Sequence, residues 1–435
     1  MRLLQITGGA GGMYCGSCIR DNALAAELQA LGHDVSLLPV YTPTRTDELN
    51  VSDGHVFFGG ISVFLEQHVP LFRRMPAFLD FLWDIPAVIK AASGRGVSVD
   101  PKDLGELTLS MLRGEHGFQA KEVTKLLRYL EGLPPFDLVV LPFSLLLGLA
   151  PPLKRALRRP VVCTLQGDDL FLDGLGEAHR REAKALIRAH AGQVDAFVAT
   201  SDYYSDYMAS YLGLPRASIH TVPIGIHLEG HDPAPRPRGE VFTLGYFARI
   251  APEKGLHLLA EAYRMLRQEK GLPPSRLRAA GYIAPEFRPY LAEVQERLRT
   301  WGLGDEFHYE GEVDRAGKIA FLRSVDVLSV PSPYAEPKGM YLLEAMANGV
   351  PWVQPRHGAF VEMQEKTGGG LLFAPGDAHD LARQVLALFQ DPEGARALGQ
   401  RGAASVRAHY TARRMAERAT EVFAAAASAA QPAVA

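Results

Sequence analysis

The chain has 435 residues, a length typical of two or three domains. Hydrophobic residues make up 47% and charged residues 22%, which excludes a largely disordered chain and provides material for two cores. The formal net charge of −3 gives no overall attraction for nucleic acid or for an anionic membrane. Three cysteines cannot form a disulfide framework, so we expect a reducing, cytoplasmic compartment. No apolar run is long enough for a transmembrane helix, and the amino terminus predicts a strand rather than a signal peptide.

Short apolar runs alternate with helical spacing in the first half of the chain. Residues 2–7 predict a strand, a glycine-rich loop follows at 8–18, and residues 19–31 have the apolar spacing of a helix. Further strands are expected at 34–41, 137–142, 160–165, 196–201 and 219–225. This order is typical of a parallel sheet covered by helices on both faces.

Between about residues 55 and 130 this alternation stops. The segment is rich in aromatic residues, proline and leucine. We interpret it as an irregular helical insertion that packs on its own domain. The alternative is a region that binds an acceptor, and its composition would suit an amphiphilic one.

A polar segment with proline and glycine, residues 229–240, predicts a linker. A second series of strands and helices follows, including a helix at 256–268. Its strands are expected at 241–248, 277–283, 307–313, 325–332 and 350–356. The sequence thus predicts an α/β protein with domains at 1–232 and 233–411 and a frayed tail at 429–435. The cleft between the two domains is the expected ligand site.

The glycine-rich loop is the first candidate site. Its glycines would let backbone amides approach an anion or a sugar, and the helix that follows adds its positive end. Gly9, Gly11 and Gly12 fit the dinucleotide-binding pattern G-x-G-x-x-G only in part, since Tyr14 stands at the last position. A tight turn without a ligand therefore stays open.

Cys15 and Cys18 form a C-x-x-C pair in this loop. The spacing is also that of redox motifs and of half a zinc site. The sequence has no second pair, and Cys163 is its only other cysteine. We therefore expect small residues packing in a crowded loop, and no bound metal.

Two cations follow the strand that ends near Ala248. Arg249 lies in the loop and Lys254 at the start of the next helix. Because a helix amino terminus and two cations attract the same charge, this placement predicts a diphosphate site. The alternative is a solvated pair of loop side chains.

Two carboxylates accompany the strand expected at 325–332. Glu336 lies in the loop after it, and Glu344 lies about one turn inside the next helix. The rise of a helix separates the two groups by roughly 8–10 Å, which suits two hydroxyl groups of one extended ligand. Glu344 has apolar neighbours and needs a partner, so a structural glutamate bound by the backbone or by a cation is the alternative.

Four segments together resemble the retaining GT-B glycosyltransferases of family 4. These are the glycine loop and helix at 11–35, the pre-linker segment at 222–226, and the blocks at 245–263 and 331–351. The resemblance covers the whole chain except roughly residues 50–130. It implies two Rossmann-like domains facing each other across a deep cleft, no required metal, and a terminal helix at 412–428 that returns to the first domain.

The resemblance also implies roles for the candidate residues. Arg249 and Lys254 would hold the diphosphate of the donor, Glu336 its sugar hydroxyls and Glu344 its ribose, with backbone contacts from Gly339, Met340, Tyr341 and from Gly11 or Gly12. Gln166 stands where the family often has histidine, near the transferred sugar, and with Asp168 it would lie on the acceptor or sugar side. Because a leaving phosphate can itself take the acceptor proton, the missing histidine need not abolish transfer.

The resemblance thus implies a metal-independent retaining transferase that moves a hexosyl group from a nucleotide-diphosphate sugar, with UDP expected. The acceptor would be a sugar or a lipid-type molecule, no nucleic acid partner is expected, and membrane contact is not indicated. An epimerase-like enzyme of the same fold and a non-catalytic sugar-binding module are the alternatives. A nicotinamide oxidoreductase is disfavoured because residues 41–44 lack the acidic residue that would bind a ribose.

Overall fold

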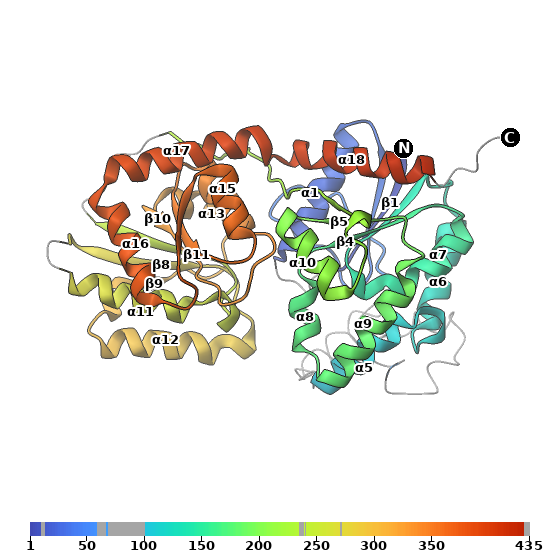
Figure 1. Cartoon of the computed structure of the whole chain (residues 1–435), viewed down its shortest axis with the longest axis horizontal. Coiled ribbons are helices and arrows are strands. Elements are labelled where there is room, and N and C mark those ends of the chain that lie inside the picture. The colour runs from blue at the N-terminus through green and yellow to red at the C-terminus, as the bar shows by residue number, and fades with distance from the viewer. Residues whose placement is uncertain are drawn as a thin grey trace. The chain divides into compact units, whose positions relative to one another are not determined.

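The computed structural model describes residues 1–9, 14–58, 67, 101–234, 239, 241–269 and 272–429. The chain forms two compact units, each an α/β domain (Figure 1). Unit 1 consists of Met1–Thr200, Tyr204–Val222 and Ala416–Ala435, and unit 2 of Ser201–Tyr203 and Pro223–Met415.

Unit 1 contains a parallel sheet built from apolar runs. Its central strands Leu138–Leu141 (β3) and Val161–Leu165 (β4) are buried at every position, as expected where helices cover both faces. The other described strands are β1 (Arg2–Thr7), β2 (Asp34–Pro39), β5 (Ala196–Ala199) and β6 (Ile219–Thr221). Their order is β2-β1-β3-β4-β5-β6, so the winding reverses between β1 and β3. Open α/β sheets bind ligands at the carboxyl ends of such strands.

Helices cover this sheet. The described ones are α1 (Gly16–Ala30), α5 (Pro101–Leu112), α6 (Ala120–Glu131), α7 (Ala150–Leu157), α8 (Asp168–Gly174), α9 (Glu177–Ala191) and α10 (Asp202–Leu212), with 3₁₀ turns η2 (Gly114–His116), η3 (Ser144–Leu149) and η4 (Arg216–Ser218). In the segment expected to be an insertion, α5 packs against α9 and η3 of the same unit. Residues 59–66 and 68–100 of that segment lie outside the described residues.

Unit 2 contains a second parallel sheet, with the strand order of the Rossmann fold. Its described strands are β7 (Phe242–Phe247), β8 (Ser275–Ala280), β9 (Phe307–Tyr309), β10 (Val327–Leu328), β11 (Trp352–Pro355) and β12 (Gly370–Phe373). Their order is β12-β11-β10-β7-β8-β9. Read from β9 and counted within the unit, this is 3-2-1-4-5-6. The winding reverses between β7 and β10. This point predicts where unit 2 binds its ligand.

The helices of unit 2 form two layers. The described ones are α11 (Leu256–Gln268), α12 (Arg288–Thr300), α13 (Arg315–Arg323), α14 (Met340–Ala347), α15 (Ala359–Thr367), α16 (Ala378–Gln390) and α17 (Pro392–His409), with η5 (Pro252–Lys254), η6 (Pro285–Phe287) and η7 (Gly304–Glu306). In one layer α11 packs on α12 and α16, and in the other α14 packs on α13 and α17. The two layers bury both faces of the sheet.

The junction before unit 2 differs from the expected boundary at 232/233. Unit 2 begins at Pro223, because the backbone of Ile226 pairs with Thr411 in a parallel bridge. The amide of Ile226 donates to Tyr410 O at 2.9 Å. Backbone pairing, which composition does not reveal, therefore attaches residues 223–232 to unit 2.

The last described helix, α18 (Ala412–Ala429), is divided between the two units. Its residues up to Met415 are part of unit 2, and those from Ala416 are part of unit 1. In unit 1, Thr420 Oγ1 lies 3.4 Å from His33 Nε2.

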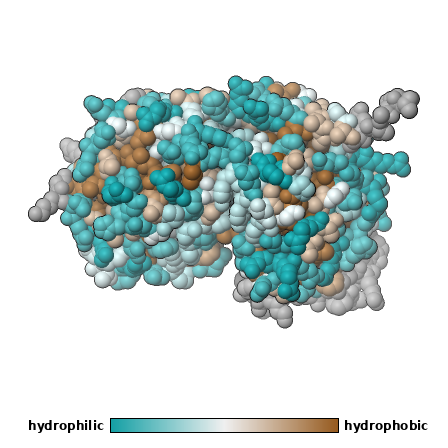
Figure 2. Space-filling view, viewed as in Figure 1, coloured by the Kyte–Doolittle hydropathy of each residue, from teal (hydrophilic) through white to brown (hydrophobic). Residues whose placement is uncertain are grey.

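Hydrophilic side chains cover most of the face shown in Figure 2, with smaller apolar areas on each unit. This mixture is ordinary for a folded protein. In the part of the chain that the structure describes, no helix has both the length and the apolar content needed to cross a membrane.

Candidate functional site

The candidate residues of unit 2 lie at the carboxyl ends of β7 and β10, where its winding reverses. Arg249 follows β7, Lys254 closes η5, and Glu336 lies between β10 and α14. The structure thus brings all three to the edge of the sheet that binds ligands in this fold.

Two close contacts hold the loops after β7 and β10 together. Gly255 has a φ of +75°, and a Cβ atom at this position would collide with the carbonyl oxygen of Pro331. The hydroxyl of Ser332 lies 2.7 Å from the carbonyl oxygen of Glu253. Only glycine permits this approach, which places the end of η5 beside the loop that carries Glu336.

Lys254 and Glu336 form an ion pair between these loops. Their side chains are only 15% and 8% exposed, so each charge has lost most of its water and depends on the other. The carbonyl oxygen of Glu336 also accepts a hydrogen bond from Ala359 N at 2.9 Å, which ties the loop to the start of α15. Lys254 and Glu336 therefore belong to one site, although the sequence suggests separate roles for them.

Arg249 forms an ion pair with Glu253 of the same loop. Its guanidinium lies 5.9 Å from the ring centre of Phe287, and its side chain is 34% exposed. Tyr246 donates a hydrogen bond to the carbonyl oxygen of Arg249 at 3.1 Å, which fixes the backbone at the end of β7. Arg249 thus presents a half-exposed cation at this edge.

Helix α14 begins beside Glu336, after Gly339 at a φ of +65°. The amides of Met340 and Tyr341 lie in its first turn, where backbone N–H groups have no acceptor within the helix. The first turn is therefore available to an anion, as the resemblance implies.

Two buried polar atoms beside Glu336 have no hydrogen-bond partner. They are the hydroxyl of Tyr341 and Nδ1 of His357. Burial raises the pKa of Tyr341, and the nearby Glu336 adds to that increase. Burial lowers the pKa of His357, against opposing effects of the Ser332 carbonyl and Glu336, so the imidazole is neutral near pH 7. A ligand that reaches Glu336 would find an unused donor and an unused ring nitrogen.

The sequence analysis assigned neither side chain to the site. His357 lies 21 residues after Glu336 in the chain, and its Nε2 lies 3.1 Å from the carbonyl oxygen of Ser332. Only the position of His357 just after β11 could have indicated it, because β11 lies next to β10 in the sheet and the two strands end at the same edge. Tyr341 was singled out for its backbone alone.

Glu344 lies inside α14, as expected, and its carboxylate is paired. Nζ of Lys318 in α13 lies 2.6 Å from its Oε1, and the two side chains are 6% and 9% exposed. The cation that the alternative interpretation requires is therefore present. The predicted ribose contact of Glu344 stays a prediction.

In unit 1, Asp168 is a buried carboxylate at the carboxyl end of β4. It accepts hydrogen bonds from the amide and hydroxyl of Ser144 at 2.7 and 2.6 Å, and from the amide of Gln166 at 3.2 Å. Burial raises its pKa, while these hydrogen bonds oppose the increase. Asp168 thus holds the loops after β3 and β4 in place.

Gln166 has one satisfied end and one free end. Its Nε2 donates to the carbonyl oxygen of Pro142 at 2.9 Å and lies 3.4 Å from Asp21 Oδ1. Its Oε1 is buried without a hydrogen-bond partner. Gln166 and Asp168 both line a cavity of about 410 Å³ within unit 1.

A buried ion pair that the sequence analysis missed lies behind Gln166. Nη1 of Arg20 lies 3.0 Å from Oδ1 of Asp21, and the two side chains are 1% and 3% exposed. Thr7, at the end of β1, donates to Asp21 at 3.2 Å. Two adjacent charged residues in the first half of a helix rich in alanine and leucine were the available signal. Gly11 and Gly12, predicted to approach the donor, lie outside the described residues.

Cys15 and Cys18 are close together at the start of α1. A hydrogen bond with Cys15 and burial both raise the pKa of Cys18, which opposes formation of a reactive thiolate. Among the described residues, no group of three or more histidine, cysteine, aspartate or glutamate side chains has the arrangement of a metal site.

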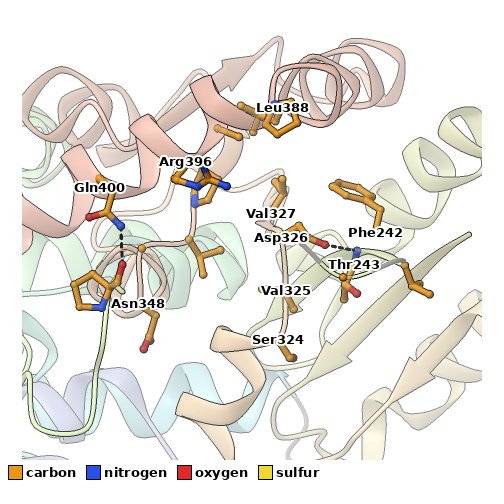
Figure 3. A pocket seen from close by; sticks show the side chains of 18 of the residues that line it. Phe242, Thr243, Ser324, Val325, Asp326, Val327, Asn348, Leu388, Arg396 and Gln400 are labelled. Carbon is orange, nitrogen blue, oxygen red and sulfur yellow. Dashed lines mark hydrogen bonds between the residues drawn. The ribbon is translucent and has the colours of Figure 1, made fainter. Parts of the chain in front are cut away.

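Unit 2 has a hollow of about 220 Å³ at the amino ends of its strands, on the side of the sheet away from Lys254 and Glu336 (Figure 3). It surrounds the amino ends of β7 and β10, where the carboxylate of Asp326 accepts from the amide of Thr243 at 2.7 Å. Arg276 and Arg396 also line it. Because α/β sheets bind ligands at the carboxyl ends of their strands, this hollow is not the candidate donor site.

Two family models match the chain. "Glycosyl transferase 4-like domain" matches residues 20–225, and "Glycosyl transferases group 1" matches residues 231–405. Together they span both units apart from the two ends and a short junction.

Curated relatives match part of the chain. A mannosylfructose-phosphate synthase of Agrobacterium fabrum is 26% identical over 229 residues, which are 50% of this chain and 50% of that protein. A phosphatidyl-myo-inositol mannosyltransferase of Mycobacterium leprae is 27% identical over 214 residues, which are 48% of this chain and 53% of that protein. The chain thus spans about half the length of the curated relatives it matches.

Solved structures match nearly the whole chain. HepE of Anabaena, in complex with UDP and glucose, has a TM-score of 0.68 at 17% identity and covers 98% of this chain and 100% of its own. Sucrose-phosphate synthase of Thermosynechococcus elongatus has a TM-score of 0.69 at 19% identity and covers 98% and 99%. At these identities the likeness is one of fold, and it confirms the expected GT-B architecture.

Proposed function

The chain is a glycosyltransferase of the GT-B, family 4 type, and we propose that it transfers a hexosyl group, with retention, from a UDP-sugar to an acceptor hydroxyl. In this proposal unit 2 holds the donor and unit 1 holds the acceptor. Two relatives are named for a mannosyl product or for mannosyl transfer, which favours a hexosyl group. The UDP bound to HepE favours uridine as the nucleoside of the donor.

The observation that carries the donor site is the pairing of Lys254 with Glu336 at the point where unit 2 reverses its winding. A nucleotide sugar offers an anion and hydroxyl groups on one molecule. Its diphosphate would bind to Lys254 and Arg249, and its sugar hydroxyls would donate hydrogen bonds to the carboxylate of Glu336. Each partner of the present ion pair would thus exchange one contact for another, and no charge would be left buried alone.

The proposed reaction balances without a general base from the protein. The bond between the anomeric carbon and the diphosphate oxygen breaks as the acceptor oxygen bonds to that carbon on the same face. The acceptor proton passes to the departing diphosphate oxygen. Arg249, Lys254 and the first turn of α14 would stabilise the negative charge that grows on this leaving group.

We further propose that these cations, rather than a metal ion, neutralise the leaving diphosphate. Activity would then survive treatment with a chelator. We also place the reaction in a reducing compartment, the cytoplasm. This proposal is supported by Cys15, Cys18 and Cys163, none of which forms a disulfide.

A binding experiment tests the donor site directly. UDP-, GDP- and ADP-hexoses are added to the purified chain and thermal unfolding is followed. A ligand at 100 times its Kd stabilises by about 2.7 kcal/mol, or a shift of roughly 5–10 °C for a domain of 150–250 residues. Arg249→Ala should reduce that shift for UDP and its sugars alike.

Arg299→Ala is the matched control, since Arg299 is 66% exposed and pairs with Glu296 on α12. An unchanged shift in both Arg249→Ala and Lys254→Ala would rule out the diphosphate assignment. Release of UDP in the presence of candidate acceptors then separates a transferase from a binding module.

A further inference from the structure

The cavity of unit 1 is lined mainly by apolar side chains. It lies at the carboxyl ends of β3 and β4, where Phe143 and Leu145 follow β3 and Phe171 belongs to α8. Leu104 and Leu107 of α5 also line it. All five are only half-buried, although side chains of this kind are stabilised by leaving water. The cavity thus keeps open an apolar surface that an apolar ligand could cover.

The charge of the cavity points the same way. Among the described residues that line it, none is a lysine or an arginine. Asp168, the one carboxylate among those residues, already accepts from Ser144 and Gln166. Burial raises the pKa of Tyr41, so this phenol is neutral. A phosphate would find no cation to pair with among these residues.

Among the described residues that line the cavity, Gln166 has a buried oxygen atom without a hydrogen-bond partner. This atom is Oε1, and Gln166 is only 4% exposed. An amide oxygen can only accept a hydrogen bond, so a hydroxyl group is the matching ligand group. The cavity therefore offers a hydrogen-bond acceptor at the Gln166 end, and most of its other described side chains are apolar.

We propose that this cavity binds the alkyl chain of an amphiphilic acceptor, with an acceptor hydroxyl donating to Oε1 of Gln166. The inference rests on the proposed transferase function, and it adds the substrate class: a hydroxyl-bearing molecule whose apolar part packs along α5. It also gives α5 a role in choosing the acceptor.

Binding in the absence of donor is the first test. A neutral fluorescent probe, N-phenyl-1-naphthylamine, is bound to the full chain and displaced by n-alkyl β-glucosides from methyl to decyl, below their micelle concentrations. Displacement should strengthen up to about fourfold for each added methylene until the cavity is filled. Equal displacement by the methyl and octyl glucosides would overturn the proposal.

Leu107→Asp should abolish the dependence on chain length by placing a carboxylate in the apolar wall. Leu49→Asp is the matched control, because Leu49 is 83% exposed in the same unit and does not line the cavity. Leu107→Trp is the second variant if the aspartate does not fold, and by filling the cavity it should shorten the longest chain that binds. Identical behaviour of the Leu107 and Leu49 variants would overturn the assignment of the cavity.

The Gln166 contact has its own readout. The wild-type chain should bind 1-octanol about two- to tenfold more tightly than its methyl ether, which cannot donate a hydrogen bond. Gln166→Leu should remove that preference and keep the chain-length dependence. Equal binding of the alcohol and the ether by the wild type would overturn the hydroxyl contact.

A parallel titration with UDP separates the two proposals. UDP binding without chain-length dependence would refute the alkyl cavity alone. Chain-length dependence without binding of any nucleotide would refute the proposed donor site, and with it the assignment of the alkyl ligand as an acceptor.

Discussion

The buried pair of Lys318 and Glu344 allows a structural role to be separated from a ligand-binding role. Lys318→Met removes the ammonium group 2.6 Å from a carboxylate that is 9% exposed. Removing one partner of such a pair destabilises by about 3–5 kcal/mol, because the remaining charge stays desolvated. For a domain of 150–250 residues this is a decrease in Tm of roughly 6–20 °C.

The double variant Lys318→Met/Glu344→Gln carries neither charge, so most of the lost stability should return. Thermal and urea unfolding of the wild type, both single variants and the double variant form a complete cycle. UDP titration of the same four proteins gives the second readout. If Glu344 contacts the ribose, the double variant should unfold almost like the wild type and still bind UDP about tenfold more weakly or worse.

Two results would refute this reasoning. Single variants as stable as the wild type would show that the pair is not desolvated in solution. A double variant that recovers both stability and UDP affinity would show that Glu344 only supports α14, and the ribose contact would have to be abandoned.

Three further predictions concern the other residues of the two sites. Lys254→Ala should weaken UDP binding about ten- to a hundredfold. Glu336→Gln should lower kcat strongly without weakening UDP binding, because the sugar hydroxyls that would bond to this carboxylate are absent from UDP. Loss of UDP binding in the glutamine variant would reverse the donor orientation. The double variant Cys15→Ser/Cys18→Ser should retain most activity, and a loss of more than about tenfold with intact folding would show a role that the raised thiol pKa does not suggest. Burial holds the pKa of His357 below its usual 6.5, so the unfolded chain binds the imidazole proton more tightly than the folded chain does. The free energy of unfolding should therefore fall as the pH drops below about 6.5. Urea unfolding should show a smaller fall in His357→Gln, and equal falls in the variant and the wild type would contradict the assignment.

Local patterns predicted the elements well where spacing and caps agreed. The helix expected at 256–268 is α11, Leu256–Gln268, and it begins after Gly255. The sequence did not predict β12, whose four residues Gly370–Phe373 follow a run of glycines. A strand so short has no measurable alternation, and only its pairing with β11 reveals it.

Partners across the fold were beyond the reach of local patterns. The apolar neighbours of Glu344 showed that it needs a partner, but Lys318 lies on another helix, and only the packing of α13 on α14 identifies it. Arg20 and Asp21 are adjacent in the sequence, yet their burial depends on strands β1 and β4. The positions of candidate side chains could thus be predicted from the sequence, and their ionic partners could not.

The ion pair of Lys254 with Glu336 has a consequence for selectivity among anions. Inorganic phosphate or pyrophosphate could compete for Lys254 but has too few donors to satisfy the carboxylate it would release, and that carboxylate is 8% exposed. A buried carboxylate without a partner opposes binding by several kcal/mol. Glu336 therefore hinders simple anions from binding to Lys254. A ligand whose hydroxyl groups reach Glu336 while its phosphates bind Lys254 avoids this penalty. Abundant cellular phosphate would then be a weak inhibitor of this site.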